Sequence, residues 1–282
     1  MIRAVLQYDF LQNAVLSAVL ASIACGIIGT IIIEKKLVMM SGGIAHTSFG
    51  GIGLGYFLNI EPIIGALVFA IGAALGIATI RRKYQTHSDV LIGMFWAVGM
   101  ALGILFIAIT PGYPPDMTSY LFGDILTVSP MDLWVMAALG GIILLVIALL
   151  FNYFRAYLFD EEFTTVRGIR TVFLEYMLFI LISLTIVVLI RVVGIILIIA
   201  LLSVPPAIAR QFTYDLKKMM LSSTLLGVVF CLMGLWISYE LNIASGASII
   251  LFSVLSFILV SVVKSRLQML RKVNTDTKDT QL

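Results

Sequence analysis

Apolar residues in this chain gather in long stretches that are separated by short polar or charged segments. A helix needs about 20 apolar residues to cross a bilayer. The nine stretches predicted to span a membrane are 9–33, 37–58, 62–80, 90–110, 131–154, 172–190, 193–209, 219–241 and 246–263. A single helix over residues 172–209 would be about 57 Å long, too long for a bilayer core of ~30 Å. We therefore expect the chain to turn near residues 191–194.

The composition agrees with this pattern. Hydrophobic residues make up 61% of the 282 positions and charged residues only 12%, whereas soluble domains carry about 25% charged residues. The chain cannot coat a soluble globule, and its spans leave no room for a separate soluble domain. We predict an all-α polytopic membrane protein with about nine transmembrane helices, eight being possible. It would form one domain over residues 1–270, followed by a polar cytoplasmic tail over residues 271–282.

The positions of the basic residues predict the orientation. With nine crossings, all Lys and Arg residues except Arg3 and Arg191 fall on one side, and basic loops face the cytoplasm. The C-terminus is therefore predicted inside and the N-terminus outside. Acidic residues that fall on the outer side are Asp9, Glu61, Asp116, Asp124, Asp132 and Glu240. They would favour cations at an entrance, although the exclusion of basic residues by topology explains much of this excess.

The second stretch contains the only histidine that is placed within a predicted span. His46 stands among glycines, Ser41, Thr47 and Ser48. An ionisable side chain at membrane depth is a functional candidate, and imidazole binds zinc and other divalent transition metals. A neutral histidine that bonds a facing carbonyl to join two helices is the alternative. One histidine alone is not a metal site, so both interpretations stay open.

The segment 159–169 is predicted to form a short cytoplasmic helix. Its helix signals are Asp160 as N-cap, Glu161 and Glu162 in the first turn, Arg167 in the last turn and Gly168 after the end. Phe159, Phe163 and Val166 follow helical spacing and form one apolar stripe. This stripe could dock into a groove of a partner or lie against the membrane surface or the bundle.

Several other features bear on function. Pro205 and Pro206 remove two backbone donors from the seventh stretch and predict a kink or break there. Such a feature could belong to a gate or could be a static packing kink. Arg191 and Glu175 are too far apart on one helix to pair, so each needs another partner. The apolar second half of the outer segment 111–130 is a candidate to return to the bundle. Phosphate-loop, nucleophile-elbow and His-Glu-x-x-His motifs are absent from the sequence, so nucleotide chemistry would require another chain.

Six blocks of residues occur in an order that resembles the permease subunits of zinc/manganese/iron ABC importers. The blocks are MSGGIAH at 40–46, DVLIG at 89–93, YLFGDIL at 120–126, FDEEF at 159–163, residues 194–210, and SYE at 238–240 with SGA at 245–247. The resemblance extends over residues 10–260.

This resemblance implies a homodimeric, non-enzymatic transport subunit in a prokaryotic cell membrane, with no intrinsic cofactor. It implies two cytoplasmic ATPase subunits, which bind ATP, and an extracytoplasmic metal-binding protein that delivers the ion. The segment 159–169 becomes the coupling helix that contacts the ATPase. His46 becomes a ligand on the translocation path. Beyond the resemblance, our hypothesis is that Asp116, Asp124 and Glu240 line the outer entrance of this path and that Pro205 and Pro206 form a gate or helix break.

One position departs from the family pattern. Many members carry an acidic residue four positions before the histidine, where this chain has Gly42. The loss of a hard oxygen ligand favours zinc over manganese or iron as cargo. The alternatives are an ABC permease for a metal chelate or vitamin, and a gradient-driven secondary transporter that would use Glu175 or Asp89.

Overall fold

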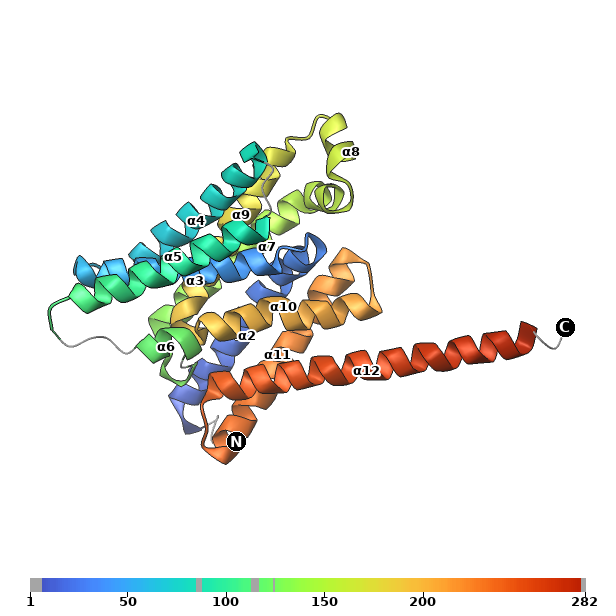
Figure 1. The fold of residues 1–282 in the computed structure, drawn as a ribbon. Coiled ribbons are helices and arrows are strands. Elements are labelled where there is room, and N and C mark those ends of the chain that lie inside the picture. Colours follow the sequence, from blue (N-terminus) through green and yellow to red (C-terminus); the bar gives the residue numbers. More distant parts are fainter. Residues whose placement is uncertain (1–6, 85–87, 113–116, 124, 280–282) are drawn as a thin grey trace.

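The computed structural model describes residues 7–84, 88–112, 117–123 and 125–279. Within these ranges the regular elements are all helical. They are α2 (Asp9–Glu34), α3 (Val38–Phe57), α4 (Pro62–Tyr84), α5 (Ser88–Ile109), α6 (Met117–Phe122), the 3-10 turn η1 (Ile125–Thr127), α7 (Pro130–Phe159), α8 (Glu161–Val166), α9 (Thr171–Val193), α10 (Ile195–Phe212), α11 (Leu216–Leu241) and α12 (Ser245–Asp279). Figure 1 shows them as one bundle from which the end of α12 projects. The all-α prediction is confirmed.

Eight of these helices are long and apolar enough to cross a membrane. The remaining long helix, α3, is less apolar because it is rich in glycine and hydroxyl residues. It nevertheless runs the same course as its neighbours: Gly43 meets Ile92 and Gly53 meets Gly103, so α3 and α5 are parallel. Helix α3 therefore lies beside two predicted spans along its length, which agrees with nine crossings.

Glycine permits this close packing of α3. A Cβ on Gly51 would overlap the carbonyl of Gly65 in α4, and a Cβ on Gly65 would overlap the carbonyl of Gly51. On the α5 side, Gly99 faces the backbone of Thr47. Small residues let membrane helices approach until their backbones touch, and most of α3 is buried as a result.

The turn expected within residues 191–194 is present. Helix α9 ends at Val193 and α10 begins at Ile195, with Gly194 at φ +78° between them. Gly123, at φ +69°, packs directly against Gly194. The segment after α6 thereby returns to the bundle, where Ile125 is buried, as the sequence analysis anticipated.

Helix α10 does not break at its two prolines. The helix is continuous from Ile195 to Phe212, with Pro205 and Pro206 inside it. Prolines at these positions free carbonyls one turn earlier, including that of Leu202. Gly29 of α2 packs on that carbonyl, since a Cβ on Gly29 would lie 2.5 Å from its oxygen. Of the predicted kink or break, the break was wrong, because α2 supplies a close-fitting surface for the proline turn.

The two ends of the bundle are held by different ion pairs. At one end, Lys35 after α2 and Arg82 of α4 both contact Glu161 of α8. At the other end, Arg191 at the end of α9 contacts residues that precede α4 and begin α7. This arrangement matches the alternation of loops from which the orientation was predicted.

We expect Gly65→Ala to destabilise the protein by roughly 1–3 kcal/mol, because the added methyl group forces α3 and α4 apart. Gly72→Ala is the matched control on the same helix, since a Cβ there meets nothing within 4 Å. Thermal unfolding of the two purified variants in detergent measures the difference. Equal melting temperatures for both variants would show that the α3–α4 contact is not limiting.

Candidate functional site

His46 lies on α3 and stacks against Trp96 of α5. The ring centroids are 3.9 Å apart and the planes differ by 11°. In the adjacent residues, the Thr47 hydroxyl donates a hydrogen bond of 2.9 Å to the carbonyl oxygen of Phe95, which joins α3 to α5 beside the histidine. Packing between the two helices therefore fixes the orientation of the imidazole.

The Nδ1 atom of His46 is buried and makes no hydrogen bond within the described residues. A histidine that served only to join helices would use its ring nitrogens for hydrogen bonds, because a buried unpaired polar atom costs about 1–3 kcal/mol. An unpaired imidazole nitrogen is the feature expected of a ligand whose ion is not bound. This observation favours the functional interpretation of His46 over the purely structural one.

The surroundings of His46 supply few other ligands. In the part of the chain that the structure describes, no three His, Cys, Asp or Glu residues come close enough together to hold a metal ion. Gly42 lies one turn before His46, and a Cβ there would meet Trp96 at 3.6 Å and Ile199 at 3.9 Å, which are ordinary contacts. A Cβ atom therefore fits at position 42, so backbone crowding does not explain the glycine.

Of the four predicted path residues the structure describes His46 and Glu240, and it does not bring these two together. Asp116 and Asp124 lie outside the described residues. Glu240 is exposed near the end of α11, which packs on α2, α10 and α12, whereas α3 packs mainly on α4 and α5. Glu240 and His46 thus belong to different parts of the bundle.

Acidic residues at the presumed outer end are partly neutralised. Arg191 lies 3.5 Å from Glu61 and 3.7 Å from Asp132. Asp132 also completes a capping box with Ser129 at the start of α7. These carboxylates have structural partners, so the outer surface attracts cations less strongly than a count of acidic residues suggests. The sequence analysis had correctly required a partner for Arg191 other than Glu175.

A contact between two tyrosines near this end was not predicted. The hydroxyl groups of Tyr56 on α3 and Tyr120 on α6 are 3.0 Å apart. Burial raises the pKa of Tyr120, and the hydrogen bond with Tyr56 adds to the rise. This hydrogen bond links α6 to the helix that carries His46. Trp96 was missed as well, because an aromatic residue in a long apolar stretch carries no distinguishing signal.

The predicted short helix is present as α8. Asp160 caps it by accepting a hydrogen bond from the Phe163 amide at 2.9 Å, and Gly168 follows at φ +80°. Thr164 faces the bundle and is fully buried. Helix α8 is therefore a fixed projection with its own cap and stop signal.

The apolar stripe of α8 faces away from the bundle. Phe159, Phe163 and Val166 are 73%, 54% and 86% exposed, and Glu162 and Arg167 are exposed beside them. The Arg167 guanidinium lies 5.0 Å from the centre of the Phe163 ring. The stripe therefore does not pack against the bundle, which was one of the predicted alternatives.

Ion pairs connect α8 to the ends of three other helices. Glu161 lies 3.0 Å from Lys35 and 3.7 Å from Arg82. Arg82 also pairs with Glu175, which is fully buried in the first turns of α9. The network thereby joins α8 to α2, α4 and α9.

We expect Arg82→Gln to destabilise the protein by roughly 2–3 kcal/mol, less than the ~3–5 kcal/mol of a fully buried pair because Arg82 is partly exposed. The loss leaves the buried carboxylate of Glu175 without its arginine. Adding Glu175→Gln to this variant should recover most of the stability, since no charge then needs a partner. Thermal unfolding of the single and double variants forms the cycle, and strictly additive losses would contradict the pairing.

Comparisons with known proteins extend over the whole bundle. The model of the ABC 3 transport family matches residues 7–264. An uncharacterized membrane protein of Synechocystis is 46% identical over 90% of each chain, and the manganese transport system membrane protein MntC of Listeria monocytogenes is 34% identical over 91% of each chain. The structure of PsaBC from Streptococcus pneumoniae in complex with Fab matches with a TM-score of 0.83 at 33% identity, covering 92% of this chain and 93% of that one.

Proposed function

Because this chain belongs to the ABC 3 transport family, we propose that it is the membrane-spanning permease subunit of an ATP-driven importer of divalent transition-metal ions. The observation that carries the cargo class is the buried, unpaired Nδ1 of His46 within a spanning helix. Imidazole is a ligand for such ions, and a coordinated ion would supply the missing partner. The metal is the cargo of the protein and not a resident cofactor.

Manganese ranks first among the candidate ions. The Listeria relative at 34% identity is named for manganese transport, and this similarity extends over nearly the whole chain. Zinc, which the sequence analysis favoured, is the alternative supported by donor chemistry, because Gly42 offers no oxygen ligand and a lone imidazole suits the softer ion. Iron remains a member of the same class without a specific observation in its favour.

A second copy of the chain would add a second imidazole to the site. One His46 per chain supplies too few ligands for a metal, since even a site with an open position uses about three protein ligands. A homodimer with its pore between the two copies would bring two imidazoles to one path. An extracytoplasmic binding protein would deliver the ion to the outer end.

ATP hydrolysis belongs to separate cytoplasmic ATPase subunits in this proposal, and α8 is the surface on which they dock. An exposed stripe of two phenylalanines and a valine suits a hydrophobic groove of a partner. The ion pairs of Glu161 with Lys35 and Arg82 would transmit the motion of a docked ATPase to α2 and α4.

The alternative of a gradient-driven secondary transporter receives less support. It would need an intramembrane carboxylate that can take up and release protons. Glu175, its main candidate, is already held by Arg82 in an ion pair. Asp89 is exposed at the start of α5. A chelate or vitamin permease would share α8 but leaves the unpaired imidazole of His46 unexplained.

We expect His46→Ala to reduce metal uptake at least tenfold in cells or proteoliposomes, while assembly with the ATPase and basal ATP hydrolysis persist. Uptake of radioactive manganese and zinc measures the loss. Trp96→Phe is the matched control, because it keeps an aromatic ring against the imidazole without removing a ligand. Normal uptake of both metals by His46→Ala would remove His46 from the path.

Gly42→Asp extends the same experiment to the choice of ion. Position 42 lies one turn from His46 and accepts a Cβ atom in ordinary contact, and the added carboxylate should raise manganese uptake relative to zinc. If Gly42→Asp leaves the ratio of manganese to zinc uptake unchanged while His46→Ala is inactive, then His46 lies on the path but position 42 does not choose the ion.

Phe163→Asp should abolish co-purification of the ATPase, since it places a charge in the centre of the apolar stripe of α8. Phe163→Tyr is the conservative control and should retain binding. Both substitutions are at Phe163, which faces away from the bundle, so the melting temperature of the isolated permease should stay the same. An intact complex with Phe163→Asp would show that the ATPase docks elsewhere.

A further inference from the structure

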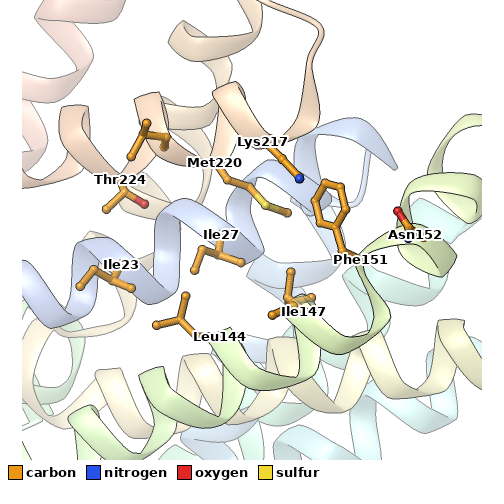
Figure 2. A pocket seen from close by; sticks show the side chains of 11 residues that line it. Ile23, Ile27, Leu144, Ile147, Phe151, Asn152, Lys217, Met220 and Thr224 are labelled. Carbon is orange, nitrogen blue, oxygen red and sulfur yellow. The ribbon is translucent and has the colours of Figure 1, made fainter.

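A large groove lies between α2, α7 and α11, away from the His46 site. Its volume is about 700 Å³, within the roughly 300–1,000 Å³ of small-ligand sites. Most of its lining is apolar, as Figure 2 shows. The apolar side chains include Ile23 and Ile27 of α2, Leu144 and Ile147 of α7, and Met220 and Leu221 of α11.

The shape of α7 opens this groove at one end. Leu150 has non-helical dihedral angles, φ −107° and ψ 15°, so that α7 kinks there. Phe151 and Asn152 follow the kink directly and line the groove. At the other end, Gly26 of α2 packs against Thr224 of α11 and brings these two helices together. The groove thus extends from the kink of α7 to this close contact of α2 with α11.

The end of the groove at the kink of α7 is polar and basic. Lys217, in the first turn of α11, lines the groove opposite Asn152, with its ammonium 5.0 Å from the centre of the Phe151 ring. Lys217 forms no salt bridge with any residue of the described ranges. The nearby carboxylate of Asp215 is engaged instead by the backbone amide of Lys218, which lowers the pKa of Asp215.

We propose that this groove binds one anionic phospholipid of the cytoplasmic leaflet, with its phosphate at Lys217 and Asn152 and an acyl chain between α2 and α7. The distance along α11 from Lys217 to Thr224 is about 10 Å, so the apolar part reaches from headgroup depth into the hydrocarbon core. On the predicted orientation, Lys217 faces the cytoplasmic leaflet, which carries the anionic lipids. Basic pockets between spanning helices on this side bind lipid headgroups.

A second copy of the chain is a poorer occupant. A protein interface over this groove would bury the ammonium of Lys217 without a carboxylate, and an unpaired buried charge is costly. A phospholipid instead offers a phosphate to Lys217 and a hydrocarbon chain to the apolar walls. Charge and apolar surface are thus both satisfied by one molecule.

The site also has a connection to α8, and this step rests on the proposed function. Helix α7 continues from Asn152 to Phe159 and leads through Asp160 into α8. Asn152 and Phe159 are seven positions apart, which corresponds to about 10 Å along a helix. A lipid wedged at the kink would set the angle of the last turns of α7 and thereby the position of α8 relative to the bundle.

Native mass spectrometry of the purified permease–ATPase complex tests the proposal, with phosphatidylglycerol and phosphatidylcholine as the probes. The wild-type complex should retain phosphatidylglycerol in preference to phosphatidylcholine, at one molecule per permease chain. Lys217→Gln should lower this retention about fivefold, the equivalent of the ~1 kcal/mol that a basic residue contributes at an anionic surface. Lys218→Gln removes the same charge one residue away, outside the groove lining, and should have little effect.

Leu144→Trp fills the apolar part and should abolish retention of both lipids without changing the number of permease chains per complex. Leu221→Trp serves the same purpose from α11 if the first variant does not assemble. Equal retention by wild type and Lys217→Gln, or equal binding of the two lipids by the wild type, would overturn the proposal. Loss of one permease chain on filling the groove would assign it to a protein interface instead. These readouts do not use metal transport, so they stand or fall separately from the proposed cargo.

Discussion

The backbone contact between Gly51 of α3 and Gly65 of α4 is the constraint on which much of this structure depends. Helix α3 carries too many glycine and hydroxyl residues to face lipid on all sides, and its peptide groups are shielded only if neighbouring helices cover them. Cβ atoms at positions 51 or 65 would prevent this approach. The polar helix can therefore exist within the bundle only because α4 and α5 enclose it.

The same enclosure places His46 where its chemistry can matter. The contact of Gly99 with Thr47 brings α5 close enough for Trp96 to stack on the imidazole. This ring fixes the histidine from one side, while Nδ1 stays without a hydrogen bond among the described residues. Stability alone does not require an unpaired buried nitrogen, and such local costs are expected at functional sites.

Features that depend on local sequence were predictable, whereas those that depend on long-range contacts were not. Hydrophobic stretches fixed the long helices, and Asp160 with Gly168 fixed the limits of α8, because capping and chain reversal are local. The stacking of Trp96 on His46 and the pairing of Arg82 with Glu175 join residues distant in sequence, which periodicity cannot reveal. The continuous course of α10 through Pro205 and Pro206 was not predicted for the same reason, since the glycine that accommodates the proline turn lies in α2.

The ion pairs of α8 and the glycine contacts of α3 form one short chain of physical connections. Glu161 of α8 contacts Arg82 at the end of α4, and α4 touches α3 backbone to backbone through Gly65. A helix is stiff over this length, so a displacement of α8 acts on the whole of α4 and not on its end alone. Because the backbones of α3 and α4 touch directly, α3 has to move when α4 moves. A motion imposed at α8 therefore has a direct mechanical route to His46, which is what the proposed docking of an ATPase on α8 requires.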